Sequence, residues 1–213
     1  MISDFLLKNA RKIVYALAFA IACATIAVHA KDWNTTTSMS DAFGYLSFSF
    51  ISLALAVSPI RALFPAWRYN ASLYMARRAL GVSSFVFAAL HYAMNPMLFY
   101  RGSLDMFLAN SGYGIWVWAG IAAIAVLFLL AATSMDYAVR KLGRRWFTLQ
   151  KLVYLAYPLI IAHAYTIGID FIGGQLDIYS GSFLLIAAAT VLLEAARIYV
   201  SLAKKAAKAM VTP

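Results

Sequence analysis

Long stretches without acidic or basic side chains alternate along this sequence with short segments rich in lysine and arginine. Most of these stretches are close to the ~20 apolar residues that a helix needs to span a bilayer. The first is longer than the roughly 7–15 apolar residues of a signal peptide, so we expect it to be a retained helix. The pattern therefore predicts an all-α integral membrane bundle of six helices in a single domain, 1–213, with spans near residues 13–30, 42–60, 79–100, 113–135, 152–169 and 178–200.

The basic residues indicate how the six predicted helices are oriented. With a cytoplasmic N-terminus, 16 of the 18 Lys and Arg residues fall in cytoplasmic segments, because only Lys31 and Arg101 fall outside (18 − 2 = 16). Such an excess is the positive-inside pattern of membrane proteins. We therefore expect both termini to be cytoplasmic, and we attribute the net charge of +10 to topology and not to nucleic-acid binding.

Composition supports a membrane protein and limits its chemistry. Hydrophobic residues make up 64% of the chain and charged residues 12%, against roughly a quarter charged residues in soluble domains. The chain has one cysteine and three histidines, which excludes a disulfide framework and a thiolate metal site. Metal chemistry would therefore have to come from imidazoles or from a bound cofactor.

Two histidines, His91 and His163, lie inside predicted spans. A histidine in hydrocarbon has lost its water and needs a partner, so it is a candidate functional residue. His91 follows Arg78 by 13 residues and His163 follows Lys151 by 12, which corresponds to ~19 and ~18 Å of helix. Because the third and fifth helices run in the same direction, both imidazoles are predicted at nearly one height, in the outer half of the membrane. His29, by contrast, is expected at the outer interface as an ordinary solvated histidine.

Several interpretations of the histidine pair follow from the residues alone. Two neutral imidazoles that face each other would suit the two axial positions of a b-type haem. A bare zinc ion needs three or four ligands and fits poorly, and a proton relay would normally use intramembrane carboxylates. The acidic residue nearest a span, Glu194, is better placed to pair with Arg197. Hydrogen bonds from each histidine to a neighbouring helix, without a cofactor, are the structural alternative.

Short motifs surround both histidines: SPIR at 58–61, ARRALG at 76–81, ALHY at 89–92, LGRRW at 142–146, LVYL at 152–155 and HAY at 163–165. As an ensemble they resemble the ferric reductase-like transmembrane domain family, over roughly residues 40–168. More narrowly, they are similar to the haem-binding membrane subunits of bacterial protein-methionine-sulfoxide reductase systems. The resemblance implies a six-helix bundle in the bacterial inner membrane, with His91 and His163 as the axial ligands of an outer b-type haem.

One position departs from the pattern of that family. Its members usually carry a further histidine 13 residues before the ligand in the fifth helix, and here that position is Gln150. Glutamine is not an ordinary haem ligand, so we expect a single haem and no inner haem of the usual kind. Trp146, Phe147 or a bound FMN or quinone would then have to bridge the inner part of the membrane.

Basic residues at the inner edge are further candidates for cofactor binding. Arg77, Arg78 and Arg144, with Arg145 beside the last of them, would suit a flavin phosphate or haem propionates. Alternatively, these residues serve only to set the topology.

The resemblance implies an electron-transfer subunit of an oxidoreductase rather than its catalytic subunit. Electrons would pass from a cytoplasmic flavin reductase or the quinone pool to a periplasmic methionine-sulfoxide reductase. One alternative is a self-contained oxidoreductase of ferric iron, oxygen or quinone, which the lack of a Gly-rich nucleotide-binding fingerprint disfavours. Another is a channel or transporter, for which the sequence shows no midplane charged residue or pair of broken helices.

Overall fold

The computed structural model describes residues 2–29, 36–99, 114–167 and 178–211, and every regular element in these ranges is helical. In chain order the elements are α1 (Ile2–His29), α2 (Thr36–Leu63), α3 (Asn70–Phe99), α5 (Gly114–Ala132), α6 (Asp136–Leu142), α7 (Arg144–Leu149), the 3₁₀ helix η2 (Gln150–Leu152), α8 (Val153–Ile167) and α10 (Ile178–Val211). The prediction of an all-α protein is therefore confirmed for the described part of the chain.

Four of the described helices, α1, α2, α3 and α10, are long and apolar enough to cross a membrane. A further candidate is the pair formed by α5 and α6, which is bent by 87° between the two helices. Helix α8 has 15 residues, and the remainder of the span predicted at 152–169 lies outside the described residues. The described helices thus agree with a multi-pass membrane protein, whereas the count of six spans stays a prediction.

Several helices extend beyond the apolar stretches from which they were predicted. Helix α1 begins at Ile2 rather than near residue 13, α3 begins at Asn70 rather than 79, and α10 continues to Val211. The apolar stretch marks only the part of a helix that lies in hydrocarbon. Helical hydrogen bonding continues through flanking residues such as Lys8, whose long side chains reach water from the membrane edge.

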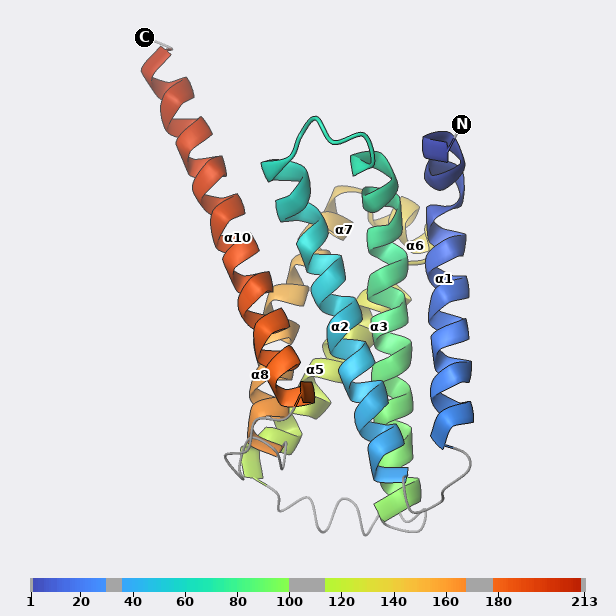
Figure 1. Ribbon diagram of the computed structural model, residues 1–213. Coiled ribbons are helices and arrows are strands. Elements are labelled where there is room, and N and C mark those ends of the chain that lie inside the picture. Colours follow the sequence, from blue (N-terminus) through green and yellow to red (C-terminus); the bar gives the residue numbers. More distant parts are fainter. Residues whose placement is uncertain (1, 30–35, 100–113, 168–177, 212–213) are drawn as a thin grey trace.

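Helices α2 and α3 form the centre of the bundle (Figure 1). Helix α1 packs on α3, α10 packs on α2, and α5 contacts both α3 and α8. One buried cluster joins α1, α2 and α3 and includes Phe43, Phe50 and Phe87. A second joins α2, α5, α8 and α10 around Phe48 and Tyr157. Helix α5 thereby brings together α3 and α8, the two helices that carry the intramembrane histidines.

Large apolar side chains cover much of the outside of the bundle. Phe19 in α1 is 72% exposed and Leu185 in α10 is 71% exposed. An apolar surface of this extent is rare on soluble proteins and marks a surface that is covered by another apolar medium. Lipid is the medium that fits helices of this length, so these side chains face the bilayer.

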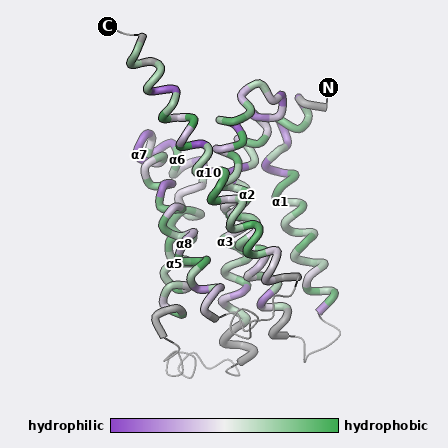
Figure 2. Tube along the Cα trace, turned by 60° about the vertical axis from the view of Figure 1, so that its left-hand side comes forward, coloured by the Kyte–Doolittle hydropathy of each residue, from purple (hydrophilic) through white to green (hydrophobic). Residues whose placement is uncertain are grey.

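The start of α1 and the end of α10 lie at the same end of the bundle, where α6 and α7 also lie (Figure 1). Figure 2 shows hydrophilic residues in α6, α7 and the adjoining parts of other helices at this end. We call it the basic end, because basic side chains of several helices gather there: Lys8, Arg11, Arg61, Arg77, Arg78, Arg144, Arg197 and Lys204.

Asp136, the first residue of α6, connects this short helix to two others at the basic end. Its Oδ1 accepts a hydrogen bond from Nη2 of Arg78 at 2.5 Å and one from Nη1 of Arg11 at 3.4 Å. The Arg78 guanidinium, with a smaller share from Arg11, holds the pKa of Asp136 below its ordinary value. The carboxylate therefore links α6 to both α1 and α3.

We expect Asp136→Asn to lower the midpoint of thermal unfolding slightly at pH 7, because exposed ion pairs contribute little each. The pKa of Asp136 is lower in the folded than in the unfolded chain, so its stabilisation is complete above pH 3.8 and is lost as the pH falls through the folded-state pKa. Thermal unfolding of both proteins in detergent at pH 7 and at about pH 2 should show a difference only at pH 7. An equal difference at both pH values would contradict the role of the ion pair.

Candidate functional site

The structure brings together the two histidines that the sequence places inside spans. His91 comes from α3 and His163 from α8, and the centres of their imidazole rings are 6.4 Å apart. Both residues are half-buried. The prediction that they lie at a common height is confirmed, because two rings at this distance belong to one layer of the bundle.

The backbone of α2 sets the orientation and the tautomer of His91. Its Nδ1 lies 2.8 Å from the carbonyl oxygen of Ser40, and a carbonyl can only accept, so Nδ1 carries the proton. The hydroxyl of Ser40 in turn donates to the carbonyl oxygen of His91 at 3.4 Å. A proton on Nδ1 places the ring's lone pair on Nε2, which is the form in which histidine commonly binds a metal.

Each histidine lies against a glycine of a neighbouring helix. A Cβ atom added to Gly44 of α2 would lie 3.1 Å from Nδ1 of His91, and one added to Gly120 of α5 would lie 2.6 Å from Nδ1 of His163. The second distance is shorter than any normal contact between these atoms. The missing side chains therefore allow both rings to approach the backbones of α2 and α5.

The separation of the rings fits one metal ion between them. A metal bound to two imidazole nitrogens at about 2 Å each, with each ring centre roughly 1 Å behind its nitrogen, keeps the centres about 6 Å apart. The observed distance is 6.4 Å, and the ring planes cross at 79°, so the rings are not stacked on each other.

A haem iron fits this donor set better than a bare ion does. Within the described ranges, no group of three or more His, Cys, Asp and Glu side chains is placed to hold a metal ion. Two axial imidazoles are sufficient for haem, because the porphyrin supplies the remaining iron ligands. The residues present therefore fit a haem with His91 and His163 as its axial ligands.

Ser40, Gly44 and Gly120 were not identified as site residues from the sequence. A signal for them was present, since small residues in membrane helices mark places where another helix or group approaches closely. The chain has 11 glycines, however, and Gly81 in α3 and Gly181 in α10 have nothing within 4 Å of an added Cβ. Only the packing distinguishes the glycines that contact histidines.

The three remaining candidate arginines lie at the basic end, each in a different setting. Arg77 donates from Nη1 to the hydroxyl oxygen of Ser58 at 2.9 Å, and Arg78 pairs with Asp136. Arg144 in α7 is exposed. The structure does not bring these three arginines together with the histidine pair.

Gln150, the candidate position on which the expectation of a single haem rests, lies in η2. Its Nε2 donates to the carbonyl oxygen of Leu130 in α5 at 3.4 Å. Nearby, Nε1 of Trp146 donates to the carbonyl oxygen of Thr133 at 3.0 Å, and the rings of Trp146 and Phe147 are 5.1 Å apart. Both hydrogen bonds fasten the turn before α8 to the end of α5.

Aromatic rings occupy the layer between Gln150 and the histidine pair. The ring of Phe48 lies 5.7 Å from that of Tyr157 and 4.1 Å from that of Phe183. The Tyr157 hydroxyl is 2.9 Å from that of Ser52. Tyr157 precedes His163 by six residues, or ~9 Å of helix, so this cluster fills the middle of the bundle.

The fold and the paired histidines define a class of membrane protein, and the comparisons agree on it. Residues 43–161 match the family of the ferric reductase like transmembrane component. This match covers more than half of the chain and contains His91 and Gln150, while His163 lies two residues beyond it. The chain belongs to this family, and the resemblance inferred from the motifs is confirmed.

Within the family, the chain is similar to protein-methionine-sulfoxide reductase heme-binding subunits named MsrQ. It is 35% identical over 113 residues to that of Brucella ovis, which covers 53% of this chain and 49% of the relative. It is 32% identical over 134 residues to that of Agrobacterium fabrum, which covers 62% and 59%. The chain thus spans about half the length of the curated relatives it matches. Its helices and these relatives identify a multi-pass protein of the bacterial inner membrane.

Proposed function

We propose that His91 and His163 are the axial ligands of one b-type haem and that the chain is a membrane electron-transfer subunit. The observation that carries the proposal is the separation of 6.4 Å between their rings. The relatives named as heme-binding subunits support it. Haem, when bound, would supply one-electron oxidation and reduction of its iron.

The residues of the chain position the ligands and exclude water. The bond from Nδ1 of His91 to the Ser40 carbonyl keeps Nε2 available as the ligand atom and raises its basicity. Gly44 and Gly120 let both rings approach neighbouring helices. The buried cluster that includes Phe43 and Phe87 keeps this layer of α2 and α3 apolar.

We further propose that the basic end is cytoplasmic and that electrons enter there. The donor would be a flavin reductase or a quinol, and the acceptor a periplasmic methionine-sulfoxide reductase at the opposite end. The positive-inside rule supports this orientation, and the names of the relatives support the acceptor. An exposed arginine such as Arg144 would suit the phosphate of FMN, whereas Arg78 already pairs with Asp136.

The direct test follows the absorbance of the purified, haem-loaded chain under anaerobic conditions. After reduction by a flavin reductase with NADH, or by a quinol, we expect the reduced spectrum to decay rapidly once the periplasmic reductase and methionine sulfoxide are added. Ferric citrate, added in place of the reductase and methionine sulfoxide, should oxidise the reduced haem much more slowly. Rapid decay with ferric citrate or oxygen, unaffected by the reductase, would instead identify a self-contained oxidoreductase.

A second expectation concerns the number of haems. Gln150 offers a hydrogen-bond donor and no metal-binding nitrogen. Because one iron uses both His91 and His163, the wild-type chain should contain about one haem. Pyridine haemochrome analysis with quantitative amino-acid analysis measures the ratio. Two haems per chain would contradict the single-haem proposal. Gln150→His tests the same point by returning an imidazole to this position, and any second haem should appear only in that variant.

A further inference from the structure

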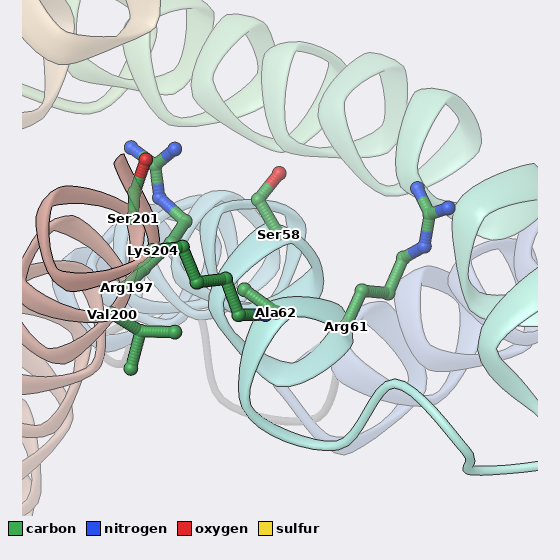
Figure 3. Close-up of a pocket in the computed structure, with 7 residues that line it drawn as sticks. All are labelled: Ser58, Arg61, Ala62, Arg197, Val200, Ser201 and Lys204. Atoms are coloured by element: carbon green, nitrogen blue, oxygen red, sulfur yellow. The ribbon is translucent and has the colours of Figure 1, made fainter. Parts of the chain in front are cut away.

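Two adjacent hollows lie along α10, the first against α2 and the second against α8 and Leu55 of α2, and together we call them the α2–α10 groove. The hollow at the basic end has a volume of ≈ 400 Å³ and is lined by residues that include Ser58, Arg61, Arg197, Ser201 and Lys204. Figure 3 shows Ser58 between Arg197 on one side and Arg61 on the other, with Lys204 extending from α10 toward α2. This part of the groove is polar and basic.

The deeper hollow is apolar. Its volume is ≈ 270 Å³, and it is lined by Tyr154, Tyr157 and Pro158 of α8, by Leu55 of α2 and by α10 residues that include Val191 and Ile198. It lies further from the basic end, because Leu55 precedes Ser58 by about one turn of α2. The groove therefore changes from basic to apolar as it enters the bundle.

The lining residues show that the two hollows are adjacent along α10. On α10, residues 190, 191, 194, 195 and 198 line the deeper hollow and 197, 200, 201 and 204 line the shallower one. The spacing of three or four residues places 190, 194, 197, 201 and 204 along one face of the helix, where the two hollows meet, while 191, 195 and 198 lie on the neighbouring face. Leu55, Ser58 and Ala62 have the same spacing on α2. The two hollows therefore meet beside α2 and α10, and the deeper one extends to α8.

The charges in the groove favour an anion at its basic end. Nε of Arg197 donates to Glu194 at 2.6 Å, which neutralises the carboxylate where the two hollows meet. Cζ of Arg61 lies 4.6 Å from the centre of the Tyr74 ring. Neither Arg61 nor Lys204 has an ion-pair partner among the residues that the structure describes. Two cations thus remain uncompensated beside the hydroxyls of the groove.

We propose that the α2–α10 groove binds one anionic phospholipid. Arg61 and Lys204 bind the phosphate, for which guanidinium and ammonium groups are the usual partners. The hydroxyls of Ser58 and Ser201 lie beside the headgroup, and one acyl chain occupies the hollow lined by Leu55 and its neighbours. The lipid would hold α10 against α2, the helix on which α10 packs.

Arg61 and Lys204 would bind a phosphate group. That group could belong to a lipid headgroup or to a soluble molecule. A soluble anion such as inorganic phosphate or FMN would use only the basic part of the groove. A phospholipid uses both parts, because its acyl chain needs the apolar hollow beneath the phosphate. The apolar hollow directly beside the basic one is the observation that favours lipid, and it does not depend on the haem.

Native mass spectrometry of the delipidated, haem-loaded full chain tests the proposal with phosphatidylglycerol and phosphatidylcholine as probes. We expect one phosphatidylglycerol to bind roughly tenfold more tightly than phosphatidylcholine. Arg61→Gln with Lys204→Gln should abolish this preference. The control, Lys8→Gln with Lys205→Gln, removes the same charge away from the groove and should preserve the preference.

Ala195→Trp provides a variant without a change of charge, because Ala195 lines the deeper hollow. It should weaken the binding of phosphatidylglycerol without changing that of inorganic phosphate. Equal binding of phosphatidylglycerol and phosphatidylcholine by the wild type would overturn the proposal. This comparison needs no variant, so it does not depend on whether a variant folds. Full displacement of phosphatidylglycerol by inorganic phosphate or FMN would also overturn the proposal and would identify a soluble anion as the ligand.

Discussion

Replacing either His91 or His163 with alanine is expected to abolish the low-spin spectrum of bound b-type haem. In the proposed arrangement each substitution would remove one axial bond to the same iron, and the remaining imidazole cannot reach across 6.4 Å to replace it. Haem content should fall by more than about tenfold, since loss of even an outer-shell partner of a metal ligand often costs that much. Absorption spectra of the purified variants, scaled to protein concentration, measure the effect.

His29→Ala is the matched control for these two variants. His29 is the last residue of α1, and its Nδ1 lies 2.8 Å from the carbonyl oxygen of Thr25 in the same helix. Its removal should leave the spectrum and the haem content unchanged. If His91→Ala and His163→Ala both retained full haem with an unaltered spectrum, the assignment of the axial pair would be wrong.

Gly120→Ala should also reduce haem binding, although it changes no ligand. The added methyl carbon would lie 2.6 Å from Nδ1 of His163, so the ring or the helix must move. Overpacking of this kind costs roughly 1–3 kcal/mol, which corresponds to a loss of affinity of about 5- to 150-fold. Haem titration of the purified apoprotein measures the affinity, and the spectrum reports any change in ligation.

Two other glycines provide graded controls for that experiment. Gly44→Ala places its carbon 3.1 Å from Nδ1 of His91, so the expected effect is smaller than that of Gly120→Ala. Gly81→Ala meets nothing within 4 Å and should leave haem affinity unchanged, while it raises helix stability by up to about 1 kcal/mol. Equal haem affinities in all three variants would show that the close approach of the glycines has no role in ligand placement.

Much of this fold was predictable because the bilayer restricts what a chain can do. Backbone groups in hydrocarbon must be paired within the helix, so an uncharged stretch of sufficient length implies a helix. The rise per residue is constant, so counting from Arg78 to His91 and from Lys151 to His163 was enough to place the two rings at one height. The distance between them in the plane of the membrane could not be counted in this way.

Features that depend on how the helices pack were not predictable. The contact of Gly120 with His163 requires a particular rotation of α5 against α8. Asp136 and Arg11 are 125 residues apart in sequence, and nothing in either local pattern indicates that they meet. For Gln150 the sequence showed the departure from the family, but only the structure showed that its amide fastens η2 to α5.

The most direct test of the central claim is electron paramagnetic resonance of the oxidised wild-type protein, with its haem-to-chain ratio measured on the same sample. If His91 and His163 bind one iron from opposite sides, the ferric haem should give a low-spin signal only, at about one haem per chain. A dominant high-spin signal, as expected for iron with a single axial imidazole, would contradict the proposed pair. So would a chain purified from haem-sufficient cells that contains no haem.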